Sequence, residues 1–187
     1  MPPIRVAITG GIAAGKSEAL AAFARHGAAT ASSDAVVHDL LAHDDDVRDA
    51  IRARWGDAAV GNRPRIGEIV FHDRDELTWL EQLLHPKTRA AIYEWLAHLD
   101  DRERRVEVPL LYETGGETRF DKVVVVTAPP AARAARRAAV DDRQGRLIPD
   151  EEKLQRADFS YVNDGSLEAL DGFVAGVVEN LLSSSAG

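Results

Sequence analysis

Residues 10–17 constrain the fold of this chain more than any other part of its sequence. Their letters, GGIAAGKS, fit the pattern G-x-x-x-x-G-K-[ST]. They stand between a β-branched apolar run at residues 4–9 and a segment with apolar residues at helical spacing at residues 17–25. Glycines let the backbone curl tightly, so that successive N–H groups and a helix N-terminus surround an anion. The sequence therefore predicts a strand, a phosphate-binding loop and a helix.

The residue types in this loop suit a nucleoside triphosphate with Mg²⁺. Lys16 places a compact charge on the β- and γ-phosphates, and the Ser17 hydroxyl can hold the metal. Glu18 follows, an acid that a helix N-terminus tolerates but that would repel nucleotide in a poor orientation. The backbone of the remaining residues is expected to cradle the phosphates: Gly11, Ile12, Ala13, Ala14 and Gly15.

The composition limits the partners that this chain can have. It has 187 residues, 31 acidic against 23 basic, and a net charge of −8, which disfavours non-specific binding to nucleic acid or anionic membranes. It has no cysteine, which excludes disulfides, iron–sulfur clusters and thiol catalysis, and no run of about 18 apolar residues that would cross a bilayer. We expect a cytoplasmic protein, a monomer or weak homo-oligomer, without nucleic-acid or membrane partners.

Strand-like and helix-like segments alternate along the chain, which predicts an α/β fold with a doubly wound parallel sheet of about five strands. A helical pattern without strand-like runs fills residues 44–101 and predicts an inserted helical region. An Arg-rich stretch lies near residues 131–149. The expected strands are residues 4–9, 28–31, 105–108, 122–127 and 159–162.

Asp34 follows the second expected strand, at the sheet edge where ligands of open α/β folds collect. Its carboxylate is able to take a proton from an acceptor hydroxyl, as in other phosphoryl transfers. It would equally serve as a cap for a helix at residues 35–41. The residues alone do not decide between these two roles.

Several segments in order resemble the dephospho-coenzyme A kinase family, nearly from end to end. They are TGGIAAGKS at 9–17, Ser32-Ser33-Asp34, LHP at 84–86 with Arg89, VPLLYE at 108–113, the strand at 121–126 and the closing segment at 157–170. The resemblance implies a P-loop NTPase-like fold and ATP-dependent phosphorylation of the ribose 3′-hydroxyl of dephospho-coenzyme A, with Asp34 as the base. This reaction is the last step of coenzyme A biosynthesis.

The resemblance also implies three parts and further site residues. The nucleotide-binding core would comprise residues 1–43, 102–130 and 158–187, the acceptor-binding insertion residues 44–101 and a short lid residues 131–157. Arg136 and Asn163 would contact the nucleotide. His85, Arg89, Tyr112 and Glu113 would line the acceptor pocket, although His85-Pro86 also suits a helix start and Glu113 a surface position.

The chain departs from the family pattern in two places. Ser32 replaces the first aspartate of Asp-Ala-Asp, and the lid is shortened, with Val140 at a basic position and Leu147 at a glutamine position. Candidates to supply the missing charge are Arg133, Arg137, Arg143 and Arg146. Two alternatives stay open: a kinase for another small hydroxyl acceptor such as a nucleoside or nucleotide, and a non-catalytic nucleotide- or coenzyme A-binding relative.

Overall fold

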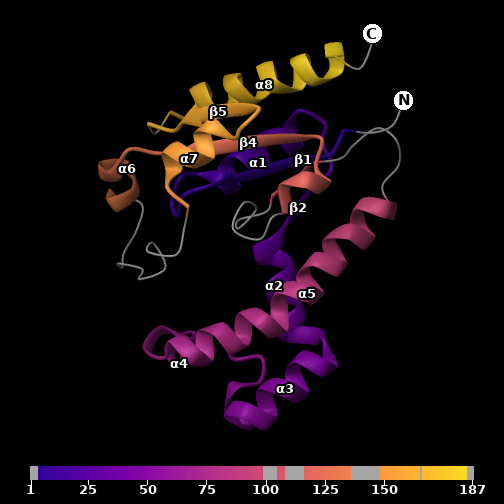
Figure 1. Ribbon diagram of the computed structural model, residues 1–187, viewed down its shortest axis with the longest axis vertical. Coiled ribbons are helices and arrows are strands. Elements are labelled where there is room, and N and C mark those ends of the chain that lie inside the picture. Colours follow the sequence, from indigo (N-terminus) through magenta and orange to yellow (C-terminus); the bar gives the residue numbers. More distant parts are fainter. Residues whose placement is uncertain (1–3, 99–104, 108–115, 136–147, 165, 185–187) are drawn as a thin grey trace. The chain divides into compact units, whose positions relative to one another are not determined.

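The computed structural model describes residues 4–98, 105–107, 116–135, 148–164 and 166–184 (Figure 1). The chain divides into two compact units. One comprises Met1–Ser32 with Leu99–Gly187, and the other comprises Ser33–His98. Each unit is described by itself below.

The first unit is built on a five-stranded sheet in the order β2-β3-β1-β4-β5, in which every neighbouring pair is parallel. The strands are β1 Val6–Gly10, β2 Thr30–Ser32, β3 Arg105–Glu107, β4 Lys122–Thr127 and β5 Phe159–Val162. Strand β1 is central, and its Gly10 pairs with Val126 of β4. The predicted parallel sheet of about five strands is confirmed.

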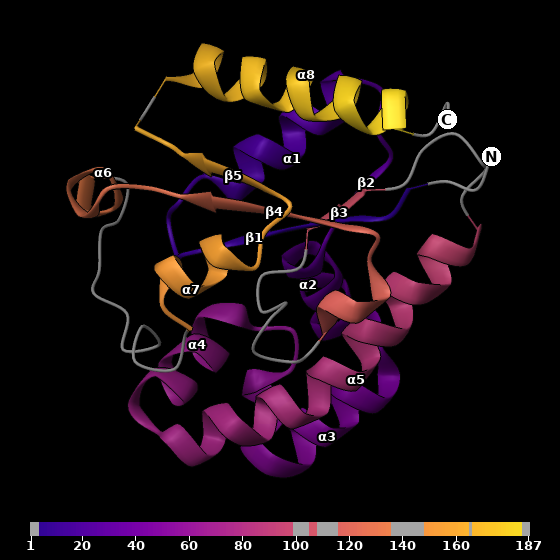
Figure 2. The same ribbon diagram turned by 45° about the horizontal axis from the view of Figure 1, so that its top comes forward.

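Helices cover both faces of this sheet (Figure 2). Alternate residues of β1 and β4, such as Ile8 and Val124, pack on one face against α1 (Lys16–Arg25) and α8 (Leu167–Ser184). Their neighbours, such as Ala7 and Val125, pack on the other face with residues 148–157, which include α7 (Asp150–Gln155). Burial on both faces explains why KVVVVT is a continuous apolar run. The remaining elements are η2 (Gly116–Arg119) and α6 (Pro130–Ala135).

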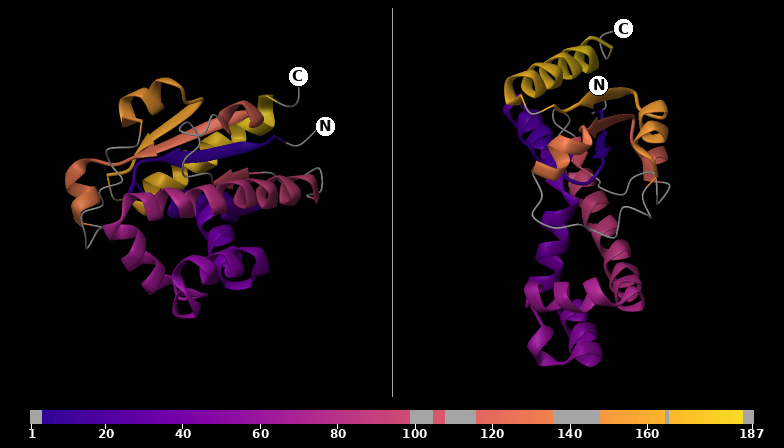
Figure 3. Two further views of the ribbon diagram at one scale, coloured as in Figure 1. Left: turned by 60° about the horizontal axis from the view of Figure 1, so that its bottom comes forward. Right: turned by 90° about the vertical axis from the view of Figure 1, so that its left-hand side faces the viewer.

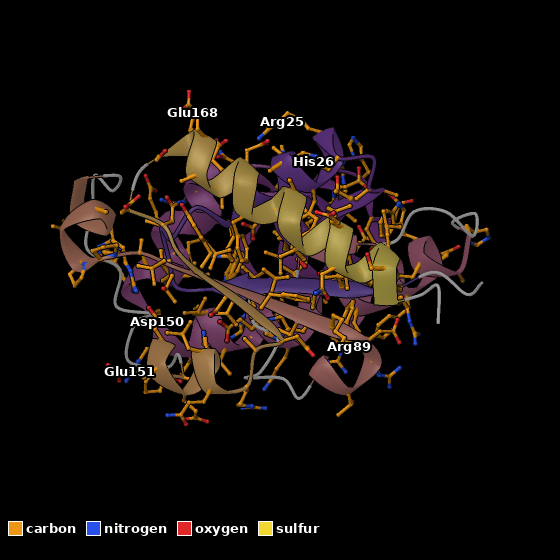
Figure 4. The ribbon with its side chains drawn as sticks, turned by 90° about the horizontal axis from the view of Figure 1, so that it is seen from above. Arg25, His26, Arg89, Asp150, Glu151 and Glu168 are labelled. Carbon is orange, nitrogen blue, oxygen red and sulfur yellow. The ribbon has the colours of Figure 1, made fainter. Side chains whose placement is uncertain are left out.

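An ion cluster joins the end of α1 to α8. Arg25 Nη2 lies 2.6 Å from Asp171 Oδ1, and His26 Nε2 lies 3.0 Å from Asp171 Oδ2. Figure 4 labels Arg25 and His26 beside α8. The Arg25 hydrogen bond, and after it the bond with His26, lowers the pKa of Asp171.

The second unit consists of helices only, and they can be followed in Figure 3. They are α2 (Ser33–His43), α3 (Asp45–Trp55), η1 (Asp57–Ala59), α4 (Arg63–His72) and α5 (Arg74–His98). Their apolar core includes Leu41, Ile51 and Leu84, with Trp55 and Trp79 packed against it. Because Leu41 of α2 belongs to this core, the helical unit begins at Ser33, one helix earlier than residue 44.

Lys87 connects α5 to the start of α3. Asp44 caps α3 by accepting a hydrogen bond from the Val47 N–H at 2.9 Å. The Lys87 ammonium donates to both oxygens of Asp44 and to Asp46 Oδ2, each at 3.0 Å. The Val47 N–H, followed by Lys87, lowers the pKa of Asp44 below its ordinary 3.8.

None of the helices in the described ranges has the length and apolar character needed to cross a membrane.

Replacing Asp44 with Ala removes both the cap and the Lys87 pair. We expect this change to lower the free energy of unfolding of the helical unit by about 1–2 kcal/mol at neutral pH. Asp44→Asn keeps a capping oxygen and should cost less. All three tryptophans lie in this unit, so urea unfolding followed by fluorescence measures it.

The Asp44 charge stabilises the fold because its folded pKa lies below the unfolded value. Its contribution is complete above pH 3.8 and is lost as the pH falls through the folded pKa, so wild type and Asp44→Asn should converge in acid. Asp46→Asn, which removes only the exposed partner of Lys87, is the control. Equal losses for Asp44→Ala and Asp46→Asn would contradict the capping role.

Candidate functional site

The loop between β1 and α1 has a backbone that glycine makes possible. Gly10 has φ 149°, and a Cβ there would overlap the carbonyl oxygen of Val126 on β4. Gly15 has φ 99° and occupies the N-cap of α1 in the left-handed region. The loop therefore turns directly from the central strand into the helix, with the α1 N-terminus behind it, as an anion cradle requires.

Lys16 folds its side chain back over this loop. Its ammonium donates to the Gly11 carbonyl at 3.0 Å, and the Ala14 N–H donates to the same oxygen at 3.3 Å. The side chain is half-buried. The positive charge is thus held at the loop, where phosphate oxygens would meet it.

Asn163 supports the loop from the end of β5. It is 4% exposed, and its side-chain amide donates to the Ala14 carbonyl at 3.0 Å. Its own N–H donates to the Thr127 carbonyl at 2.7 Å, which continues the β4–β5 pairing. Through this bond Asn163 holds the position of the loop backbone.

Ser17 and Glu18 lie exposed in the first turn of α1. Among the described residues no group of three His, Asp or Glu side chains is arranged to hold a metal by itself. Mg²⁺ commonly takes one or two protein oxygens together with phosphates and waters. The accessible Ser17 hydroxyl fits that kind of site, in which the ion arrives with the nucleotide.

Asp34 lies exposed in the first turn of α2, two residues after β2 ends at Ser32. The helix begins at Ser33, so Asp34 stands inside it instead of preceding it as a cap would. No hydrogen bond within the described part of the chain engages its carboxylate. The carboxylate is therefore available to a ligand.

The predicted acceptor residues on α5 belong to the helical unit. His85 is half-buried and Arg89, one turn further along, is exposed. Helix α5 continues through Pro86 from Arg74 to His98. The suggestion that His85-Pro86 begins a helix is therefore wrong, because neighbouring turns carry the helix past the missing proline N–H.

Three predicted site residues, Tyr112, Glu113 and Arg136, lie outside the described residues. The same holds for Arg137, Arg143 and Arg146. Of the arginines proposed to replace the missing charge, Arg133 is described.

Arg133 and Asp150 form an ion pair next to the loop at Gly11. No motif marked Asp150 as a site residue, since an acidic triplet at residues 150–152 is typical of the first turn of a helix. Figure 4 labels Asp150 and Glu151 on α7. Lys153, fully buried on the same helix, also carried no motif that would have marked it.

A family model described as "Dephospho-CoA kinase" matches residues 4–169. A dephospho-CoA kinase from Thermosynechococcus vestitus is 34% identical to this chain, and the aligned region covers 89% of each of the two chains. The structure of a dephospho-CoA kinase from Campylobacter jejuni superposes with a TM-score of 0.71 at 26% identity, covering 97% of this chain and 98% of that one. A shikimate kinase from Aquifex aeolicus, at 13% identity with a TM-score of 0.56 and coverage of 98% and 99%, shares the fold.

Replacing Asn163 with Ala leaves the buried Ala14 carbonyl without its amide donor. An unsatisfied buried acceptor costs about 1–3 kcal/mol, so we expect the affinity for ATP to fall by roughly 5- to 150-fold. Asn163→Asp should weaken binding further, because it turns an oxygen toward the carbonyl. Isothermal titration with ATP measures both effects, and an Asn163→Ala variant with wild-type affinity would contradict the supporting role.

Proposed function

The chain belongs to the dephospho-CoA kinase family, and from this premise we propose how its own residues carry out the reaction. The reaction is phosphoryl transfer to a hydroxyl of dephospho-CoA, the final step of coenzyme A biosynthesis. We take ATP as the donor and the ribose 3′-hydroxyl as the acceptor. The observation that carries the proposal is the loop geometry, in which Gly11 holds the Lys16 ammonium at the phosphate cradle.

On the donor side, the amides of residues 11–15 and the Lys16 ammonium bind the β- and γ-phosphates. The Ser17 hydroxyl holds Mg²⁺, which withdraws charge from the phosphate oxygens when it is bound. Asn163 keeps the loop in place through the Ala14 carbonyl. Most of the rate enhancement is expected from this positioning and charge neutralisation.

On the acceptor side, Asp34 orients the hydroxyl and receives its proton. The ribose oxygen forms a bond to the γ-phosphorus while the bond from that phosphorus to the ADP oxygen breaks. The exposed carboxylate at the start of α2, two residues beyond the carboxyl end of β2, supports this assignment. The carboxyl ends of the parallel strands, where ligands of open α/β folds bind, are also where β1 continues into the phosphate loop.

We further propose that His85 and Arg89 of the helical insertion bind the acceptor, together with Tyr112 and Glu113 of the core segment at residues 102–130. Arg89, exposed on α5, has the planar fork that suits a phosphate of the acceptor. Arg136, in the proposed lid at residues 131–157, contacts the nucleotide. We place the reaction in the cytoplasm, where ATP is available, with the two small substrates as its partners.

Two substitutions test the assigned roles. Lys16→Ala should remove most turnover, because the phosphate charge loses its neutralising group. Asp34→Asn should reduce kcat by roughly 10²- to 10⁴-fold with ATP affinity nearly unchanged, as expected for a lost general base. Production of ADP in a coupled assay with saturating dephospho-CoA and Mg²⁺ measures kcat.

Asp39→Asn is the matched control, since Asp39 is an exposed carboxylate on the same helix and pairs with His43. It should retain wild-type turnover. Near-normal turnover of Asp34→Asn would overturn the base assignment. A clear preference for a nucleoside over dephospho-CoA in the same assay would overturn the acceptor.

A further inference from the structure

Gly11 is the point at which the phosphate loop meets the segments that follow β4. It is buried, and its carbonyl accepts the Lys16 ammonium at 3.0 Å. A Cβ added to Gly11 would lie 2.8 Å from Arg133 Nη1 and 3.2 Å from Asp150 Oδ1. The guanidinium and the carboxylate thus occupy the space that a side chain would need. One residue therefore links the Lys16 ammonium to the Arg133–Asp150 pair.

Arg133 is fixed in this place by two acceptors. Its Nε donates to the Ala128 carbonyl at 2.6 Å, and its Nη2 pairs with Asp150. The side chains of Arg133 and Asp150 are only 25% and 23% exposed. A planar guanidinium bound at both ends and partly buried has little freedom, so it forms a rigid support for the backbone that it touches.

The charge of Arg133 is already balanced where it stands. The Asp150 carboxylate and the Ala128 carbonyl engage the guanidinium, which lies next to Gly11 of the loop. A displacement of Gly11 would carry with it the carbonyl that holds Lys16. We therefore expect Arg133 to influence nucleotide binding by holding the loop backbone at Gly11, and not by contacting the nucleotide.

We propose that Arg133, held by Asp150, is a positioning residue of the phosphate site that acts through Gly11. The pair holds the loop backbone in place, so that the loop amides and the Lys16 ammonium are already positioned to bind the triphosphate. It also ties α6 and α7, the described elements on either side of residues 136–147, to the same loop residue. The inference rests on the proposed use of ATP at this loop.

Steady-state kinetics test whether the Arg133–Asp150 pair holds the loop. The variants are Arg133→Ala, Asp150→Asn and the double variant. Each single change should raise KM for ATP roughly tenfold, and the double variant should be no worse than the worse single one, because both remove one coupled contact. KM for dephospho-CoA should stay unchanged. A decrease of KM for ATP in Asp150→Asn would overturn the proposal, since it would show that Arg133 binds the phosphates directly.

A substitution at Gly11 supplies an independent test. Gly11→Ala should raise KM for ATP, because its methyl displaces the guanidinium. In the Arg133→Ala background the same methyl has room and should cost less. Equal effects of Gly11→Ala in both backgrounds would overturn the contact, whereas a smaller effect in the Arg133→Ala background supports it.

Glu151→Gln is the matched control: it neutralises the exposed carboxylate next to Asp150 in the same first turn and should leave KM for ATP unchanged. Thermal unfolding and direct ATP titration of each variant separate loss of fold from loss of binding. Wild-type protein that does not bind ATP would refute the proposed function itself. If the wild-type protein binds ATP and the Arg133→Ala variant binds it with the same affinity, only the proposed support of the loop by Arg133 is refuted.

Discussion

Strands β1 and β4 approach each other so closely at Gly10 that the Val126 carbonyl fills the place of a side chain. Because β1 is the central strand and continues directly into the loop, this approach decides where the following amides and Lys16 stand. Asn163 at the end of β5 then binds the loop at Ala14, and Arg133 beyond β4 lies beside it at Gly11. The site is therefore an extension of the sheet.

Four of the 23 basic residues of this chain are lysines, and three of these direct a compact ammonium at oxygen atoms. Lys87 directs its ammonium at three carboxylate oxygens, and Lys16 directs its own at the Gly11 carbonyl of the loop. Lys122 pairs with Asp158 at 2.8 Å, and Lys153 is fully buried. Arg133 shows the contrasting use, in which a planar fork spans a carbonyl and a carboxylate at once.

Much of the fold follows from the sequence where burial imposes a simple pattern. The strands at 122–127 and 159–162 have the predicted bounds, whereas the second strand moved from 28–31 to 30–32, since alanine, threonine and serine leave no apolar pattern there. The loop was predictable from its glycine and lysine spacing. The contact of Asp150 with Gly11 was not, because the packing of α7 on the sheet produces it.

The helices that lie between β2 and β3 in the chain have a core of their own. Among the described residues this core shares no member with the two apolar layers of the sheet. A single helix often connects neighbouring parallel strands, whereas here the connection contains a compact helical unit with its own core. Substitutions within this core therefore leave the described residues of both sheet layers unchanged, so evolution or an engineer can alter the helical module and keep the sheet from which the phosphate loop extends.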